Sequence, residues 1–331
     1  MNEVKNLSAP PDVRVDVVNR IMDRVGVSTR PEEFVCEVAW SFQLAHGPAQ
    51  SEGTVESRLR RCTSYPVFVE ALEHARPANS VLLYCCGEGL VGLGESYIRS
   101  EWRKVWPQVE RVETLAISPR LLWDESRWPR EQFDAVVSLS QLHFIYNLDQ
   151  FFEMTGRCLK RGGVYVMAKE VNARYFQQPA LQAELAELRA ENRKRKRWEA
   201  YSPQRYWGFI KRKLGMQKPT ERSAFEKAND RIREKLGSRA PLTPVEISRI
   251  VEIHRPAETL DGPQIGMNGL DVDHLAKNYL RGYELEWKKT SNHMGFTHTD
   301  LLAPKWRKRE QELGAQFPDD GAYLSCAWRK Q

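Results

Sequence analysis

The spacing of apolar residues predicts helices in the first part of the chain. From Val15 to His46, apolar positions recur at helical intervals, which indicates two or three helices. A further helix is predicted from Tyr65 to His74, because Pro77 ends the helical pattern just beyond it. The polar segment Met1–Val13 is typical of a tail. We therefore expect residues 1–74 to form an N-terminal helical cap.

The pattern then changes to short apolar runs bounded by glycine and charged residues. Ser80–Cys86 is apolar on both faces and is followed by Gly87-Glu88-Gly89, which is typical of a buried parallel strand that opens into a tight turn. Three more strands are predicted in this part of the chain, at Val112–Ile117, Phe133–Leu139 and Val164–Ala168. An amphipathic helix is predicted at Leu148–Leu159. Alternating strands and helices predict an α/β fold for residues 75–171.

The last third of the chain again differs in pattern. From Asn172 to about Asp273 the sequence is polar and helical in its spacing, and we expect residues 172–280 to be a helical insert. Tyr283–Thr290 and Ala322–Arg329 are predicted to be two paired strands. Residues 281–331 would then complete the sheet.

The segment FDAVVSLSQLHFIYNLDQFFEMTGRCLKRGGVYVMAKE, from Phe133 to Glu170, resembles the fourth and fifth strands of class I S-adenosylmethionine-dependent methyltransferases. Asp134 opens a strand, Leu142-His143 follow its end, and a Gly-Gly turn leads into the next strand. The C-terminal GAYLSCAWRK looks like the seventh strand, antiparallel at the sheet edge. The resemblance implies a Rossmann-like methyltransferase sheet with helices on both faces, an N-terminal helical cap and a helical insert after the fifth strand.

The same resemblance assigns the first two strands to the cofactor. VLLYCCGEG takes the place of the family's glycine-rich first motif, and VETLAISPRLL that of the second strand. S-adenosylmethionine is thereby implied as cofactor, with contacts from the positions Cys85, Cys86, Gly87, Gly89, Ala116, Ser118 and Leu142.

Three of the positions depart from the family pattern. Leu83 stands where the first strand usually has an acid, Cys85 replaces the first glycine, and Ala116 replaces the acid that binds the ribose. A hydrogen bond to a charged group is worth about 1.5–3 kcal/mol, so losing two weakens binding roughly a hundredfold to a thousandfold or more. The link between Ala116 and Asp134 is also short, so the third strand is expected to be abbreviated or absent.

Three residues are candidates for catalysis. His143, at the carboxyl end of a predicted strand, could be a general base, line the pocket, or pack beside the glycine loop. Glu170 follows the next strand and could meet an amine or hydroxyl acceptor, or cap the following helix. His254 lies in a loop rich in glycine and proline that would suit a substrate lid, and it could be catalytic or structural.

The net charge of +6 is concentrated in the helical insert. Arg193–Arg197 and Lys211–Lys213 are basic runs, with Trp198, Tyr206 and other aromatic residues between them. Such a segment could be an amphipathic lid, an interfacial helix or an RNA-binding surface. We favour the lid, because the family places its acceptor-recognition element at this point.

The cysteines and the hydropathy indicate in which compartment the protein is expected. The six cysteines have no metal-site spacing and no secretory signal precedes them, so a reduced cytoplasm is expected. No apolar run approaches the roughly 18 residues of a transmembrane helix.

Two hypotheses about function remain. The first is a methyltransferase that acts on a small-molecule acceptor by O- or N-methylation. The second is a catalytically inactive methyltransferase-like protein that supports another subunit in a homo- or hetero-oligomer. Nucleic acid is not an expected partner, because an RNA-binding enzyme rests on the basic insert alone.

Overall fold

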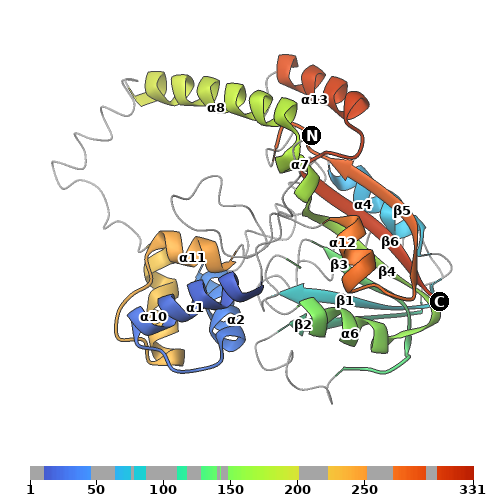
Figure 1. Ribbon diagram of the computed structural model, residues 1–331, viewed down its shortest axis with the longest axis horizontal. Coiled ribbons are helices and arrows are strands. Elements are labelled where there is room, and N and C mark those ends of the chain that lie inside the picture. The colour runs from blue at the N-terminus through green and yellow to red at the C-terminus, as the bar shows by residue number, and fades with distance from the viewer. Residues whose placement is uncertain are drawn as a thin grey trace.

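The computed structural model describes residues 11–45, 64–75, 78–86, 110–117, 128–139, 142, 148–200, 223–251, 271–295 and 304–331. These residues form a sheet with helices on both faces, a separate group of four helices, and a long helix that extends away from the sheet (Figure 1). No helix within these ranges is long and apolar enough to cross a membrane.

The sheet has six strands in the order β2-β1-β3-β4-β6-β5. Strands β1 to β4 are mutually parallel, whereas β6 is antiparallel to both of its neighbours. The strand bounds are β1 Ser80–Cys86, β2 Arg111–Ile117, β3 Phe133–Leu139, β4 Leu159–Val171, β5 Tyr283–Ser291 and β6 Tyr323–Lys330. The predicted α/β fold is therefore confirmed, as is the pairing of the last two strands.

The predicted position of the last strand was wrong. We expected it at the sheet edge, but β6 lies between β4 and β5, and β5 is the edge strand. Burial explains this order. The central residues of β6 are buried on both faces, whereas the first half of β5 is largely exposed and carries charged side chains. Exposed charges are typical of edge strands, because they oppose pairing with another chain.

Both faces of the sheet are covered by helices, as predicted. Helix α4 (Ser64–Glu73) contacts β4, β5 and β6, and its buried residues share a core with apolar side chains of the strands. The opposite face is covered by α6 (Leu148–Cys158) and by residues at α12 (Val272–Asn278). Figure 1 shows α4 on one side of the strands and α6 and α12 on the other.

Strand β4 is longer than its sequence pattern predicts. Residues 160–163 were expected to form a turn between helix and strand, but β4 already begins at Leu159, directly after α6. Leu159 pairs with Phe133, and a register shift follows before Ala135 pairs with Val164. Gly162 adopts a φ of +76°, which accommodates this irregularity without steric cost.

Asp134 fixes the amino ends of three neighbouring strands. Its carboxylate accepts hydrogen bonds from the amides of Asn79 (3.1 Å) and Ser80 (2.9 Å) at the start of β1. Lys160 of β4 donates to the other carboxylate oxygen at 2.7 Å. Burial alone would raise the pKa of Asp134, but these hydrogen bonds outweigh it and lower the pKa below the ordinary value.

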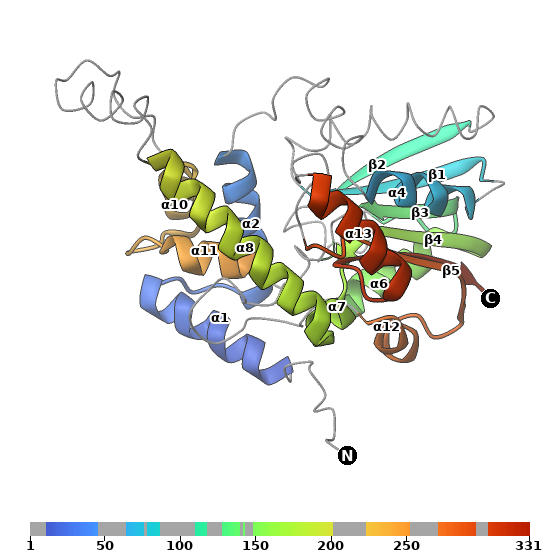
Figure 2. The same cartoon turned by 90° about the horizontal axis from the view of Figure 1, so that it is seen from above.

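Four helices form a group with an apolar core of its own. They are α1 (Pro11–Val25), α2 (Pro31–Ala45), α10 (Ala224–Leu236) and α11 (Pro244–Val251). The two N-terminal helices thus pack against two helices of the predicted insert. Both views place this group on the side of the sheet toward which β1 points (Figures 1 and 2).

Helix α8 (Pro179–Ala200) follows the short helix α7 (Ala173–Gln177) and packs against α13 (Pro304–Gln316). Arg309 donates from Nε to Glu184 at 2.9 Å, and Lys305 pairs with Glu191 at 2.7 Å. The two helices therefore run antiparallel. Their apolar residues are buried together in a core that includes Leu181, Leu185, Leu188, Trp306 and Leu313.

Candidate functional site

The carboxyl ends of the parallel strands define the candidate site. Strand β1 has β2 on one side and β3 on the other, so the chain reverses its direction of travel across the sheet at β1. Open α/β sheets bind ligands outside the carboxyl ends of the strands at such a switch point. The site is therefore expected at the ends of β1, β2, β3 and β4.

Two residues of the predicted cofactor set lie side by side at this edge. Cys85 of β1 pairs with Ala116 of β2, and Cys86 pairs with Ile117 in the final register position of both strands. The sequence predictions for Cys85, Cys86 and Ala116 thus refer to one small region of backbone. Neither Cys85 nor Ala116 can supply a carboxylate there.

Several predicted site residues lie outside the described part of the chain. These residues are Gly87, Gly89, Ser118, His143 and His254. Their proposed roles stay predictions. Leu142 and Glu170 are described, and the structure brings these two residues together.

A bulge at the end of β4 decides where Glu170 lies. The register with β6 shifts between Met167 and Glu170, so that Glu170 pairs with Leu324. Lys169, inside this irregularity, adopts a left-handed φ of +57°, which is uncommon for a residue with a side chain. Side chains of a strand normally alternate between the two faces of the sheet, and the extra residue interrupts this alternation in β4. Glu170 therefore lies on the same face as its partner Leu324, in the core under α6.

The side chain of Glu170 is fully buried and joins two strand ends. Its Oε1 accepts a hydrogen bond from the amide of Leu142 at 3.2 Å. Leu142 is itself fully buried, and it follows the end of β3 in the chain. Glu170 therefore holds Leu142 in place after the end of β3. The amide of Leu142 donates to Glu170 and not to a ligand.

The alternative interpretation of Glu170 as a helix cap was wrong. The N-cap of α7 is Asn172, whose side chain accepts from the amide of Arg174 at 3.2 Å. Asn172 also donates to the carbonyl of Gly321 at 2.8 Å, which ties the start of α7 to the turn before β6. Glu170 precedes this cap and belongs to the strand.

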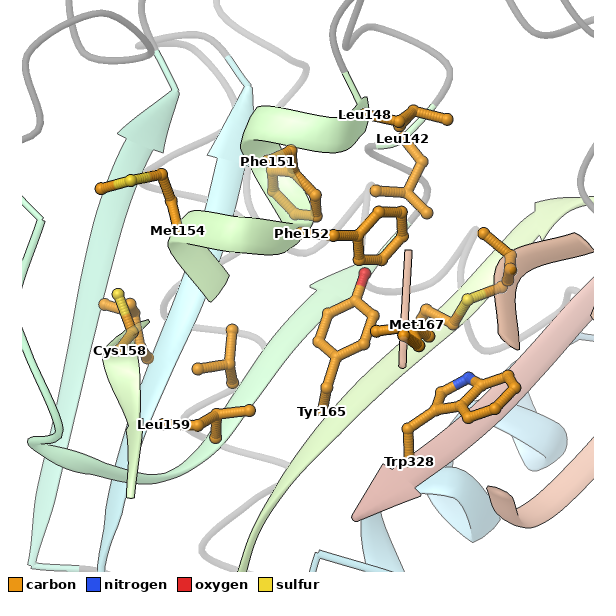
Figure 3. Close-up of a cluster of buried hydrophobic side chains, with 14 of the residues drawn as sticks. Leu142, Leu148, Phe151, Phe152, Met154, Cys158, Leu159, Tyr165, Met167 and Trp328 are labelled. Atoms are coloured by element: carbon orange, nitrogen blue, oxygen red, sulfur yellow. The ribbon is translucent and has the colours of Figure 1, made fainter. Parts of the chain in front are cut away.

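A second polar pair lies on the same face and was missed by the sequence reasoning. The hydroxyls of Ser138 (β3) and Tyr165 (β4) are 2.7 Å apart, and both residues are fully buried. Figure 3 shows the hydroxyl of Tyr165 directed toward Phe152 and Leu142. The sequence could have indicated this pair, because Ser138 and Tyr165 are hydroxyl residues among the apolar residues of two neighbouring strands.

Burial controls the ionisation of this pair. Desolvation raises the pKa of Tyr165 well above its ordinary value, and the negative charge of Glu170 acts in the same direction. The hydrogen bond with Ser138 opposes the shift without reversing it. Tyr165 is therefore neutral at physiological pH and acts as a hydrogen-bonding group of the core.

No group of three or more metal-ligating side chains is found among the residues that the structure describes. Of the six cysteines, Cys36, Cys158 and Cys326 are described, and each is buried. Burial raises the pKa of Cys326, which keeps that thiol protonated.

Sequence comparison identifies the family of the segment that carries these strands. Residues 109–167 match the methyltransferase-domain family, and this match begins just before β2 and ends within β4. This part of the chain is therefore similar to a methyltransferase domain, and its strands belong to an α/β sheet. The antiparallel direction of β6 agrees with the arrangement that the sequence resemblance implied, although β6 does not lie at the sheet edge.

Several solved methyltransferase structures are similar to this chain. One is the Haloferax volcanii complex of the Trm112 methyltransferase activator with a methyltransferase, with 12% identity, a TM-score of 0.39, and coverage of 91% of this chain and 99% of that chain. Another is a methyltransferase from Mesorhizobium loti, with 13% identity, a TM-score of 0.38, and coverage of 82% and 100%. A third, from Thermotoga maritima, has 11% identity, a TM-score of 0.35, and coverage of 88% and 100%. No curated protein matches the sequence.

The described groups that could meet the S-adenosylmethionine implied by the resemblance are main-chain groups at the carboxyl ends of β1 and β2. Peptide groups at the ends of β1 and β2 lie at the switch point of the sheet. They do not fit a bidentate grip on the ribose by an acid of β2, because Ala116 occupies that position.

Proposed function

We propose that this protein is an S-adenosylmethionine-dependent methyltransferase that acts on a small-molecule acceptor at an oxygen or nitrogen atom. The observation that carries the proposal is the match of residues 109–167 to the methyltransferase-domain family, on the strands whose carboxyl ends form the candidate site. The four-helix group lies on the side of the sheet toward which β1 points, which supports a small, enclosed acceptor (Figures 1 and 2).

The methyl donor would be held chiefly by main-chain groups. Cys85 and Cys86 at the end of β1 provide them, together with Gly87 and Gly89, which follow in the sequence. Ser118 follows β2 and is proposed to contact the ribose in place of the missing acid. When bound, the cofactor would supply an electrophilic methyl group for in-line attack by the acceptor atom, with the thioether sulfur of S-adenosylhomocysteine as the leaving group, so catalysis would depend mainly on orientation.

Glu170 is proposed to position the loop that follows β3. It holds the amide of Leu142, and His143 is the next residue in the chain. His143 would accept the proton that an oxygen or nitrogen acceptor loses, which a general base can do near neutral pH. The buried carboxylate of Glu170 therefore acts through Leu142 and not on the acceptor itself.

The four-helix group is proposed to enclose the acceptor. Its helices α1 and α2 come from the N-terminus, and α10 and α11 come from the insert, yet they share one core. Arg24 Nε of α1 donates to Glu246 of α11 at 2.9 Å, which joins the two chain segments at the surface. His254 follows α11 in the sequence and is proposed to line the acceptor side of the site.

Calorimetric titration with S-adenosylhomocysteine tests the proposal directly. We expect measurable binding below about 1 mM, which corresponds to a binding free energy of about −4 kcal/mol or better. Glu170→Gln keeps an oxygen that can accept from Leu142, so its affinity should stay within about threefold of the natural chain. Glu170→Ala removes the acceptor and should weaken binding at least tenfold.

Glu310 offers a matched control for the positioning role of Glu170. It is a second buried carboxylate that accepts main-chain hydrogen bonds, but it lies on α13. Glu310→Ala should leave the affinity unchanged in protein shown to be folded by circular dichroism. Equal weakening by Glu170→Ala and Glu310→Ala would show that Glu170 acts only through general stability.

A second candidate function is a methyltransferase-like subunit without its own activity. The observation that favours it is the pairing of Cys85 with Ala116, which puts two neutral replacements next to each other at the cofactor edge. No heat of binding at 1 mM S-adenosylhomocysteine, from folded protein, would reject the enzyme and favour this candidate. The next step would then be a search for a partner methyltransferase subunit by size-exclusion chromatography of cell extracts.

A further inference from the structure

A lysine near the end of β4 carries an inference that deepens the proposed function. Lys169 lies two residues before Val171, the last residue of β4, at the edge of the sheet where the candidate site is expected. The neighbouring strand β3 leads toward His143, the proposed general base. A charge on Lys169 therefore belongs to the acceptor side of the proposed site rather than to the ends of β1 and β2.

The backbone of Lys169 has a conformation that is unfavourable for a lysine. Its φ of +57° lies in the left-handed region, which residues with a side chain rarely adopt. The amide of Lys169 donates to the hydroxyl of Ser325 at 3.1 Å, inside the register shift between Met167 and Glu170. Glycine would adopt this conformation without the steric cost. Residues held in this way concentrate at active sites and ligand clamps, so the side chain of Lys169 is a candidate for a binding role.

The side chain of Lys169 lies on the face of the sheet that α4 covers and extends toward the carboxyl end of β4. Leu324 belongs to the core on the other face, so its neighbours Tyr323 and Ser325 lie on the α4 face. The ammonium of Lys169 lies 5.4 Å from the centre of the Tyr323 ring. Tyr323 pairs with Val171. The charged end of the lysine is therefore nearer the edge of the sheet than its own backbone is.

The apolar core under α4 ends just before this lysine. Ala168 is the last residue of β4 in that core, and Lys169 is partly exposed. Glu170 lies on the opposite face, where it accepts from the amide of Leu142. The ammonium of Lys169 is thus only partly withdrawn from water, at the border between the core and the edge of the sheet. A partly desolvated charge gains more from an opposite charge than a fully exposed one does.

The other cations at this end of the sheet already have acidic partners. The ion pairs are Lys288 with Asp319 (3.0 Å), Lys289 with Glu70 (2.5 Å) and Arg174 with Asp320 (3.0 Å). Lys169 forms no ion pair with an acid of the described part of the chain, and its ammonium lies over the ring of Tyr323 instead. A tyrosine ring attracts a cation but does not neutralise its charge. Lys169 therefore brings a positive charge to the site that these acids do not balance.

One ammonium suits a carboxylate better than a phosphate. A phosphate group carries between one and two negative charges near neutral pH, and proteins bind it with several donors, such as arginine forks and helix amino ends. At this end of the sheet, Lys169 is the cation without an acidic partner among the described residues. A carboxylate carries one negative charge, which one ammonium can match through a charge-assisted hydrogen bond.

We propose that Lys169 binds a carboxylate group of the acceptor and orients the acceptor for methyl transfer. The proposal rests on the proposed function, because it places the acceptor at the ends of β3 and β4. The acceptor would then be a small carboxylic acid that also carries the hydroxyl or amine to be methylated. Lys169 contributes affinity and orientation, and it takes no part in proton transfer.

Ligand-observed NMR with matched carboxylates and carboxamides tests the proposal. The probes are small hydroxy and amino carboxylates, each paired with its own amide, such as para-hydroxybenzoate with para-hydroxybenzamide. They are titrated into the full chain with and without S-adenosylhomocysteine. We expect a carboxylate that binds at least about tenfold more tightly than its amide. Lys169→Gln should reduce this preference to within about twofold, whereas Lys169→Arg, which keeps the charge, should retain most of it.

Lys289→Gln is the matched control. It removes an exposed cation from the same face of the sheet and should leave the carboxylate preference unchanged. A preference that survives in Lys169→Gln would overturn the proposal, even if that variant unfolds at a lower temperature, because the lysine would then be structural only. Equal loss in both glutamine variants, or no preferred carboxylate with the natural chain, would also overturn it.

Calorimetry with S-adenosylhomocysteine on the same samples separates this proposal from the proposed function. Binding of S-adenosylhomocysteine without any carboxylate preference would reject the role of Lys169 alone. A carboxylate preference that depends on Lys169, in folded protein that does not bind S-adenosylhomocysteine, would keep the carboxylate site and reject methyl transfer.

Discussion

The buried hydroxyl pair of Ser138 and Tyr165 allows a quantitative test of how the candidate site is supported. The two oxygen atoms are 2.7 Å apart, and neither side chain reaches solvent. Ser138→Ala leaves the phenol of Tyr165 without this partner, and Tyr165→Phe does the same to the serine hydroxyl. Each single change should lower the free energy of unfolding by about 1–3 kcal/mol.

The double variant should cost much less than the sum of the two single variants. In the double variant both hydroxyls are absent, so neither is left buried without its hydrogen-bond partner. We therefore expect a coupling free energy of about 1–2 kcal/mol between the two positions. Urea unfolding measures it through the fluorescence of Trp128 and Trp328, which lie in the same core. Additive losses would refute the direct hydrogen bond as the source of stability.

The pH dependence gives the same pair a second, independent check. Burial raises the pKa of Tyr165 in the folded protein. The contribution of Tyr165 to the free energy of unfolding is therefore fully present below the ordinary pKa of about 10 and is lost as the pH rises above it. Tyr165→Phe has no phenol to ionise. The stability difference between the natural chain and Tyr165→Phe should therefore shrink between pH 9 and pH 11, and a constant difference would contradict the assignment.

Three further changes test other contacts of the fold. Asp134→Asn should cost about 1–2 kcal/mol at pH 7, and because the folded pKa of Asp134 is lowered, the difference should be lost as the pH falls through that lowered pKa, as measured by urea unfolding. Glu310→Gln should cost about 1–3 kcal/mol, since its amide group cannot accept from one of the two main-chain amides that Glu310 holds, and thermal unfolding will show it. Gly321→Ala would place Cβ 2.6 Å from the backbone of Ser291, so we expect a loss of about 1–3 kcal/mol and slower refolding into β5–β6, whereas unchanged stability would contradict the close approach.

Much of the sheet could be predicted from sequence, because local pattern determines its strands. Ser80–Cys86 and Phe133–Leu139 are apolar on both faces and bounded by turn residues, and both are strands with those limits. A buried parallel strand needs no information from distant residues to be recognised. The resemblance of Phe133–Glu170 to a methyltransferase likewise depends on spacing along the chain and agrees with the family match.

Only part of the candidate site could be predicted from the sequence. Its edge and the residues Cys85 and Ala116 follow from strand order, but the contact between Leu142 and Glu170 does not. That contact depends on a bulge at Lys169, whose left-handed backbone is stabilised by the neighbouring strand through a hydrogen bond to Ser325 at 3.1 Å. Nothing in the order of residues 167–170 indicates that one of them is displaced.

The sequence by itself determined which segments are strands or helices, since hydrophobic periodicity and turn residues act over a few neighbours. Only the tertiary structure decided how distant segments meet. It placed β6 inside the sheet, joined the N-terminal helices to α10 and α11, and packed α13 against α8. These choices depend on which apolar faces can be buried together, and that is settled by packing over the whole chain rather than by local pattern.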